Sequence, residues 1–248
     1  MSAMDRSTVT VITVCLNSAA TVERTIRSVL GQTYRRVEHI VVDGGSTDGT
    51  LDIVERYRRH LAKVISEPDG GMYDAINKAL SVSEGEWIHV LNSDDYYASR
   101  TALASAVACL DEKYTNYFRM WREYPSGRRV LQSWRGPRWA LYVAAFIPHP
   151  TLVLSRSQYE AVGPYDPSYR IAGDHELILR CVRRWPPREH PLALTVMTQG
   201  GMSAKHLDVS LAEFARATER HGMPRALARS VMRAKKAWWH LRVSRQPS

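Results

Sequence analysis

The chain has 248 residues, of which 44% are hydrophobic and 24% charged, a composition typical of a globular protein with a sizeable core. Its three cysteines, Cys15, Cys109 and Cys181, are far apart and form no CxxC pair, which argues against a zinc ribbon or a disulfide framework. The net charge is +9, but residues 216–248 hold nine Lys and Arg against one Glu and so account for +8. The remainder is nearly neutral, which disfavours a nucleic-acid-binding groove.

An apolar run, Val9–Leu16, lies near the start of the chain. It is too short to cross a bilayer and is interrupted by threonines. It also differs from a signal peptide, because Asp5 precedes it and no small-residue cleavage site follows. We therefore interpret this run as a first strand and expect a cytoplasmic protein.

The first half of the chain alternates between strand and helix patterns. The first strand should end at Cys15, and a helix capped by Asn17 or Ser18 should follow it and stop at Gly31. Further strands are predicted over residues 37–43, 62–67 and 86–91, and further helices over 48–60 and 72–82. This alternation predicts a parallel sheet with right-handed crossovers and helices on both faces.

The second half is less regular. Residues 114–146 are rich in Trp, Tyr and Arg, with turn signals at 125–127 and 136–137. A strand over 148–155, a helix that ends near 162, a helix over 173–184 and a strand over 192–198 are predicted after it.

Polar residues gather where the predicted strands end, at Asn17, at Asp43, at residues 67–69 and at residues 92–95. Ligands of open α/β sheets bind beyond the carboxyl ends of the strands. Loops from four different strands would not be expected to share this property by chance. The sequence therefore predicts a binding site at this edge of the sheet.

Two of these clusters contain acidic residues directly after a strand. In VDGGSTDGT, the glycines permit close approach of a ligand and Asp43 can accept hydrogen bonds from a base or ribose; alternatively, the segment is a tight turn with a Ser46 or Thr47 cap. In NSDD, residues 92–95, the paired carboxylates favour a divalent cation shared with phosphates. The alternative is a helix cap whose acids interact with the helix dipole.

Two further clusters open predicted helices. Asp69 and Gly70 precede a helix whose N-terminal N–H groups suit an anion or a sugar hydroxyl, and Asp74 and Lys78 lie at helical spacing within it. Asp174 begins the helix of AGDHELILR, where a carboxylate on a rigid element can act as a general base. In both cases an ordinary capped helix is the alternative.

Taken in order, the segments TVITVCLN, VDGGSTDGT, EPDGGMYDAINKAL, LNSDD and AGDHELILR resemble the bacterial family 2 glycosyltransferases over roughly residues 8–205. The resemblance is closest to the subgroup that acts on glycolipids or lipid-linked surface polysaccharides. It implies a GT-A fold, Rossmann-like with a mostly parallel sheet, and an inverting hexosyltransferase. Such an enzyme uses a nucleotide-diphosphate sugar, a divalent cation (Mg²⁺ or Mn²⁺) and a glycolipid or lipid-linked acceptor.

The resemblance also implies roles for individual residues. Asp94 matches the metal ligand of a DxD-like motif, Asp43 the contact to the base, and Asp174 the general base. Gly173 stands where the family usually has a Glu before the base, and His206 is a candidate second metal ligand. The remaining residues expected at the donor are Asn17, Asp69, Gly70, Lys78, Asn92, Ser93 and Asp95. Residues 200–203 resemble a donor-side loop, and His149 faces the acceptor or is structural.

The resemblance divides the chain into a transferase domain, residues 1–205, and a C-terminal segment, residues 206–248. Within the domain, residues up to about 98 should bind the nucleotide sugar and residues from about 99 the acceptor.

A basic amphipathic helix is predicted over residues 225–245. Leu227, Val231, Trp238 and Leu241 recur at helical spacing, and much of the remainder is basic. We expect this tail to dock the enzyme on the anionic cytoplasmic face of the plasma membrane, with packing on its own domain as the alternative.

Two other functions are open to the sequence. A nucleotidyltransferase acting on a sugar phosphate would share the sheet and the carboxylates, but residues 17–20, Asn-Ser-Ala-Ala, lack the glycines and basic residues of a triphosphate loop. A non-catalytic membrane or nucleic-acid adaptor would leave the strand-end carboxylates unexplained.

Overall fold

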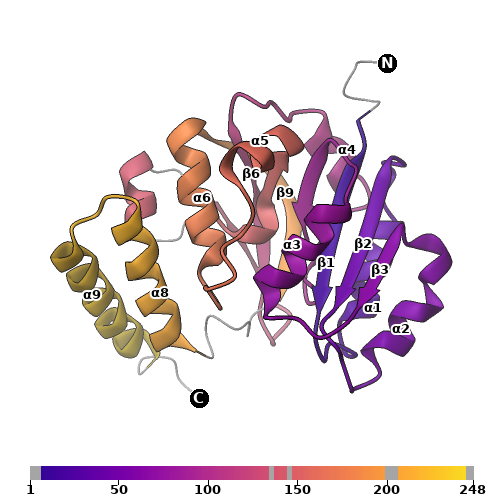
Figure 1. Ribbon diagram of the computed structural model, residues 1–248, viewed down its shortest axis with the longest axis horizontal. Coiled ribbons are helices and arrows are strands. Elements are labelled where there is room, and N and C mark those ends of the chain that lie inside the picture. The colour runs from indigo at the N-terminus through magenta and orange to yellow at the C-terminus, as the bar shows by residue number, and fades with distance from the viewer. Residues whose placement is uncertain (1–6, 134–136, 144–146, 199–205, 244–248) are drawn as a thin grey trace.

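The computed structural model describes residues 7–133, 137–143, 147–198 and 206–243. Its first half alternates strands and helices as predicted (Figure 1). The elements are β1 (Val9–Cys15), α1 (Val22–Leu30), β2 (Val37–Asp43), α2 (Thr50–Arg56), β3 (Lys63–Ser66), α3 (Met72–Val82) and β4 (Trp87–Val90). The helix expected over 48–60 is shorter than predicted, because α2 ends at Arg56 and a 3-10 turn, η2 (Arg58–His60), follows it.

The second half contains more regular structure than the sequence suggested. Its elements are β5 (Tyr96–Tyr97), α4 (Ala102–Val107), β6 (Thr115–Glu123), β7 (Arg129–Gln132), η3 (Arg138–Tyr142), η4 (His149–Thr151), β8 (Leu152–Ser155), α5 (Arg156–Val162), α6 (Gly173–Arg184), β9 (Pro187–Thr198), α8 (Leu207–Arg220) and α9 (Arg225–Val243). The aromatic stretch after residue 114 forms the hairpin β6–β7, whose turn closes when Gly127 N donates to Tyr124 O over 2.8 Å. The turn expected at residues 136–137 begins outside the described residues.

The described strands form one nine-stranded sheet in the order β3-β2-β1-β4-β8-β6-β9-β5, with β7 paired to β6. Strands β1, β2, β3, β4, β6 and β9 run in one direction, and β5, β7 and β8 run in the other. The carboxyl end of β9 therefore lies at the same edge of the sheet as the carboxyl ends of the first four strands.

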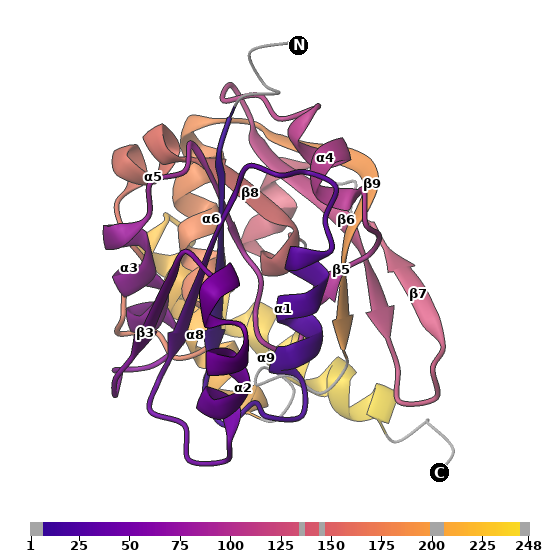
Figure 2. The ribbon, with the colours of Figure 1, turned by 90° about the vertical axis from the view of Figure 1, so that its right-hand side faces the viewer.

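Both faces of the sheet are covered by helices, as predicted (Figure 2). Along β1, Ile12 and Val14 pack against α3 and the core beneath α5 and α6. Val11 and Cys15 face the other way, towards the cores formed with α1, α2 and α4. This alternation is the period of two that a strand buried on both faces requires.

The start of α1 differs from the prediction. Its cap position is Thr21, with no side-chain cap bond, and the backbone carbonyl of Ser18 accepts from the N–H groups of Thr21 and Val22. Asn17 instead has a left-handed backbone with φ of 49° and holds a neighbouring loop. The expected capping role of Asn17 and Ser18 side chains was wrong, because their side chains bond across the sheet edge.

Helices α8 and α9 form a pair at one end of the molecule, where α8 lies between α6 and α9 (Figure 1). Ala228 and Met232 of α9 are buried, whereas Leu227 is 51% exposed. Within the described residues, no helix is long and apolar enough to cross a membrane.

Candidate functional site

Asp43 ends β2 and organises the loop that follows it. Its Oδ2 accepts hydrogen bonds from the backbone N–H of Gly45 (3.2 Å) and Ser46 (3.1 Å) and from the Ser66 hydroxyl (3.0 Å). The side chain is fully buried. Asp43 therefore fixes the Gly-rich turn and joins it to the end of β3.

The loop after β3 approaches this turn closely at Gly44. A Cβ on Gly44 would lie 2.5 Å from the Asp69 Oδ2, so a larger residue here would displace the Asp69 carboxylate. Asp69 is itself oriented by the N–H of Gly71, which donates to its Oδ1 over 2.8 Å. Pairing of β2 with β3 brings Asp43 and Asp69, 26 positions apart in the chain, into adjoining loops, and Gly44 leaves room for the Asp69 carboxylate between them.

The loop after β1 joins the same edge. The Ser46 hydroxyl accepts from the N–H of Asn17 over 2.8 Å, and the Thr47 N–H donates to Asn17 Oδ1 over 2.9 Å. Ser18 continues the chain of contacts, since its hydroxyl accepts from the Ser93 hydroxyl over 2.9 Å. The loops after β1, β2, β3 and β4 are therefore linked to one another, as the sequence predicted.

The Asn92–Asp95 turn is held in place by its backbone carbonyls. Thr25 Oγ1 on α1 donates to the carbonyls of Ser93 (2.9 Å) and Asp95 (2.6 Å). Arg24 on the same helix donates to the Asp94 carbonyl over 3.2 Å, and Thr198 Oγ1 at the end of β9 donates to it over 3.1 Å. Helix α1 and strand β9 thus both position Asp94 through its backbone carbonyl.

Oxygen atoms of this turn fit a hard cation. Asp95 is 2% exposed and its Oδ1 has no hydrogen-bond partner, and the buried Oδ1 of Asn92 has none either. Burial and the neighbouring Asp94 carboxylate raise the pKa of Asp95 well above its usual range. Buried, unpaired carboxylate and amide oxygens are costly, and Mg²⁺ and Mn²⁺ prefer such oxygen ligands.

The other expected donor residues lie in different settings. Lys78 on α3 contacts Glu67 (2.8 Å), Asp74 (3.5 Å) and the Pro68 carbonyl (3.2 Å), so it ties the loop after β3 to its helix. The Gly70 N–H at the start of α3 is already taken by the Asp74 carboxylate over 3.0 Å.

His206 is exposed and precedes α8, and within the described ranges no group of three or more His, Cys, Asp or Glu side chains is arranged to hold a metal. The expected donor-side loop, residues 200–203, lies outside the described residues.

Asp174 lies in the first turn of α6 and is partly buried. Its Oδ1 accepts from the His175 N–H (2.7 Å) and from the Tyr73 hydroxyl (3.4 Å). Burial raises the pKa of Asp174 to about 6, while these hydrogen bonds lower it. A carboxylate with a pKa near neutrality is well matched to accept a proton at physiological pH.

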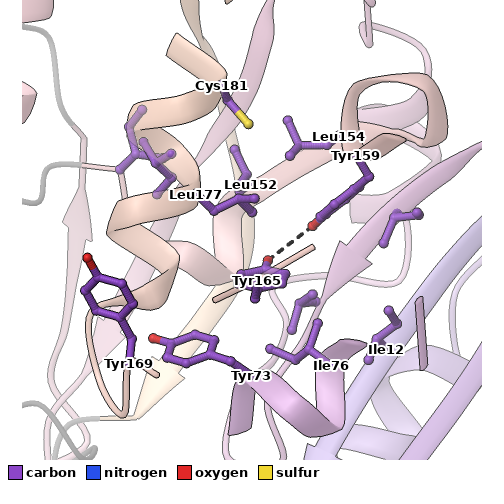
Figure 3. Close-up of a cluster of buried hydrophobic side chains, with 14 of the residues drawn as sticks. Ile12, Tyr73, Ile76, Leu152, Leu154, Tyr159, Tyr165, Tyr169, Leu177 and Cys181 are labelled. Atoms are coloured by element: carbon purple, nitrogen blue, oxygen red, sulfur yellow. Dashed lines mark hydrogen bonds between the residues drawn. The ribbon is translucent and has the colours of Figure 1, made fainter. Parts of the chain in front are cut away.

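Four tyrosines, Tyr73, Tyr159, Tyr165 and Tyr169, lie in the hydrophobic core that includes residues of α6 (Figure 3). Tyr73 stacks on Tyr165 with ring centroids 5.5 Å apart, and Tyr165 bonds Tyr159 over 3.2 Å. His149 Nε2 is 2.8 Å from the Tyr165 hydroxyl, and burial lowers its pKa to about 4. Of the two alternatives for His149, the structural one is favoured, because the ring is 6% exposed and hydrogen-bonded within the core.

Tyr73 also explains the departure from the family pattern at residue 173. A Cβ on Gly173 would lie 2.7 Å from Tyr73 Cε2, closer than side-chain carbons approach. The family's usual Glu therefore has no room before Asp174 in this chain.

Comparison with known proteins decides which family this fold and these loops represent. The family described as "Glycosyl transferase family 2" matches residues 10–158, which contain most of β1, all of β2 to β8 and the loops that follow the first four strands. The chain belongs to glycosyl transferase family 2. It is therefore a glycosyltransferase, and the resemblance seen in the sequence is confirmed.

Two groups of relatives come from mycobacteria. The chain is 36% identical over 180 residues to an "Uncharacterized glycosyltransferase" of Mycobacterium tuberculosis, covering 70% of this chain and 68% of that protein. It is 29% identical over 176 residues to a "PGL/p-HBAD biosynthesis glycosyltransferase" of Mycobacterium bovis, covering 67% of this chain and 66% of that protein.

Solved structures confirm the GT-A fold. Staphylococcus aureus TarS 1-349 in complex with UDP-GlcNAc matches with a TM-score of 0.67 and 22% identity, covering 91% of this chain and 70% of that chain. A mannosyltransferase from Pyrobaculum calidifontis in complex with GDP-Man and Mn²⁺ matches with a TM-score of 0.65 and 20% identity, covering 98% and 77%. The chain spans 42% of the chain in another TarS structure. At these identities the likeness concerns the fold.

Several residues that shape the site could not be predicted from the sequence. Arg24 and Thr25 occupy ordinary helix positions, and their partners are carbonyls about 70 positions away. Tyr73 reads as a core aromatic within α3. The adjacent Arg and Thr beside the apolar face of α1 are the one sequence feature that could have predicted this role. Because that pattern is common on helices, it does not identify a site.

Proposed function

We propose that this glycosyltransferase moves a sugar from a nucleotide-diphosphate sugar to an acceptor hydroxyl with inversion at the anomeric carbon. The observation that carries the proposal is the joined edge of the sheet, where the loops bearing Asp43, Asp69 and Asp94 are hydrogen-bonded or packed together. This edge is where α/β sheets bind nucleotides. The domain division at about residue 205, with donor and acceptor halves meeting near residue 98, is part of the same proposal.

On the donor side, Asp43 and Asn17 shape the pocket for the nucleoside, and Asp69 lies beside it. Asp94 is the proposed ligand of a divalent cation, with Asn92, Ser93 and Asp95 close by and His206 as a further candidate. A cation held there would supply positive charge that neutralises the negative charge developing on the leaving nucleoside diphosphate. Lys78 and Gly70 contribute indirectly, because their contacts hold the loop that carries Asp69.

On the acceptor side, Asp174 accepts the proton of the attacking hydroxyl. The acceptor oxygen forms a bond to the anomeric carbon while the bond from that carbon to the diphosphate oxygen breaks. The nucleoside diphosphate leaves with the bonding electron pair. Because a single displacement inverts the anomeric configuration, no residue has to form a covalent bond to the sugar.

The names of the relatives suggest the class of acceptor. One mycobacterial group is named for biosynthesis of PGL and p-HBAD, and TarS is a poly(ribitol-phosphate) N-acetylglucosaminyltransferase. We therefore propose a glycolipid, lipid-linked or surface-polymer acceptor.

We also propose that α9 docks on an anionic membrane surface at the cytoplasmic face of the plasma membrane. Leu227, which begins the apolar stripe predicted from the sequence, and Ala234 are exposed, whereas Val231 between them is half-buried. Ala228, Met232 and the partly buried Lys235 face α8 instead. The face of α9 that carries Ala228, Met232 and Lys235 therefore packs on the protein itself, which was the alternative left open by the sequence. The side chains of Trp238 and Leu241 lie outside the described part of the chain.

The proposed transfer is tested with a panel of nucleotide sugars that vary in base and sugar, in the presence of Mn²⁺, Mg²⁺ or EDTA. We expect at least one donor to release nucleoside diphosphate with a divalent cation and not with EDTA. Anomeric inversion is checked by NMR of the product. Release of pyrophosphate from a nucleoside triphosphate and a sugar phosphate would instead identify a nucleotidyltransferase, and no release from any donor would contradict both enzymatic functions.

A further inference from the structure

The segment before the catalytic helix is bound by one carboxylate from α8. Glu213 Oε1 accepts from the N–H of Arg170 (2.8 Å), and its Oε2 accepts from the N–H groups of Ile171 (2.8 Å) and Ala172 (2.9 Å). Glu213 is only 9% exposed. Buried N–H groups such as those of Ile171 and Ala172 need acceptors, and one carboxylate supplies them together with the neighbouring N–H of Arg170.

The same segment is held from its other side by α3. The Tyr73 hydroxyl donates to the Ile171 carbonyl over 2.6 Å, so the N–H of Ile171 is fixed by α8 and its carbonyl by α3. Tyr73 also contacts the Asp174 carboxylate. The backbone that leads into Asp174 is therefore fixed from two directions, immediately before the helix begins.

Glu213 is part of a larger contact between α8 and this loop. Arg216 lies over the Tyr169 ring at 3.6 Å, and Arg220 pairs with Asp166 over 2.7 Å. Positions 213, 216 and 220 recur at the spacing of one helix face. One face of α8 thus contacts the loop at three successive points as the loop approaches α6.

We propose that Glu213 on α8 is a positioning residue for Asp174, so that the C-terminal helices belong to the working active site. The inference rests on the proposed role of Asp174 as general base. A base contributes only when its oxygen lies in line with the acceptor proton, and a displacement of about 1 Å can reduce turnover by about 100-fold. Glu213 prevents this displacement by fixing the three residues that precede Gly173.

The test compares Glu213→Gln with Glu219→Gln, a matched change on the same helix. Gln has one acceptor oxygen, and its NH₂ group would face backbone donors, so E213Q breaks the contact with little change in volume. Glu219 Oε2 lies 4.0 Å from Arg225 Nε at the start of α9. We expect E213Q to lower kcat by about 10- to 100-fold, with the donor KM within about 2-fold, and E219Q to change neither.

Two further readouts separate positioning from a general loss of stability. Burial is the main cause of the raised pKa of Asp174 and the charge of Glu213 adds to it, so E213Q should move the acid limb of the pH profile to lower pH. Hydrogen exchange of the Arg170, Ile171 and Ala172 amides should become faster in E213Q, relative to amides of β1. If E213Q does not fold, Arg220→Ala, a change at an exposed ion pair with the same loop, should lower kcat and speed the exchange of these amides more weakly. Because it removes a positive charge, it should not move the acid limb to lower pH.

Three outcomes are distinguishable. If no donor is turned over, the proposed function is wrong. If D174N keeps full turnover, the assignment of Asp174 as the base is wrong. Either result removes the basis of the inference about Glu213. If turnover depends on Asp174 but E213Q behaves as E219Q does in kcat and amide exchange, the positioning role of Glu213 alone is wrong.

Discussion

Among single residues, Asp174 has the environment that bears most directly on chemistry. Its carboxylate is partly buried and receives hydrogen bonds from His175 and Tyr73. Burial outweighs these bonds and raises its pKa to about 6, above the usual value of about 3.9. Asp174 is therefore mostly deprotonated at neutral pH, and its buried charge lowers the free energy of unfolding there.

This cost predicts opposite effects of Asp174→Asn on activity and stability. Because the folded pKa is raised, stability falls as pH rises from about 4 to about 6 and stays lower above that range. Asn cannot ionise, so D174N should have a Tm a few degrees above wild type at pH 8 and an equal Tm near pH 4. Its kcat should fall by at least about 100-fold. Thermal melts at the two pH values, with steady-state kinetics, check both expectations.

In the wild-type enzyme, the same pKa predicts that kcat/KM declines as pH falls below about 6. A flat profile from pH 5 to 8 would contradict the assignment of Asp174 as the base.

The acidic loop residues were predictable, and the side chains that orient them were not. Asp43, Asp69 and Asp94 follow strands, and the ends of parallel strands must meet at one edge. Glu213 and Arg24 act on backbone groups about 40 and 70 positions away, and no local pattern marks such partners. Metal ligation by Asp94 and His206 remains a prediction.

At the scale of elements, β2, α3 and α6 have the bounds expected from the sequence. Each combines a clear hydrophobic period with Gly or Asp at its boundary. Strand β5 was missed, because it is two residues long and is defined only by pairing of Tyr96 with Val196 and of Tyr97 with Thr195. The helix α4 that follows lacks a strong amphipathic pattern, since it consists largely of small residues.

Contact between α3 and α6 predicts a specific sensitivity at Gly173. In Gly173→Ala, the new Cβ would meet the Tyr73 ring at 2.7 Å, so the helices must separate. We expect a loss of about 1–3 kcal/mol in the free energy of unfolding, together with reduced kcat. The loss should be smaller when Tyr73 is also changed to Leu, and a double-mutant cycle measured by denaturant unfolding gives this coupling. Equal losses in both backgrounds would contradict the contact.

For the whole molecule, α8 lies between α6, which carries Asp174, and α9 (Figure 1). Glu213 contacts the loop before α6, and Lys236 of α9 pairs with Asp208 of α8 over 2.7 Å. Removing α9 would therefore expose a packed face of α8. Membrane docking is therefore better tested by substitutions at exposed positions of α9 than by deleting the helix.

Membrane docking predicts that Leu227→Ser combined with Ala234→Asp weakens binding to vesicles that contain anionic lipid by about 10-fold or more. Leu131→Ser, which alters an apolar residue of similar modest exposure on β7, is the control. Flotation of the full-length proteins measures the bound fraction, which should also fall as salt is raised. Equal flotation of the double variant and wild type would refute docking through this face.

The central claim is that acidic residues at one edge of the sheet hold a divalent cation against the donor diphosphate. It is tested most directly by titrating nucleoside diphosphates into wild type, Asp94→Ala and the exposed control Asp52→Ala, with Mn²⁺ and with EDTA. The account predicts Mn²⁺-dependent binding by wild type and D52A, and binding at least about 10-fold weaker by D94A. Mn²⁺-dependent binding of equal strength by D94A and wild type would contradict it.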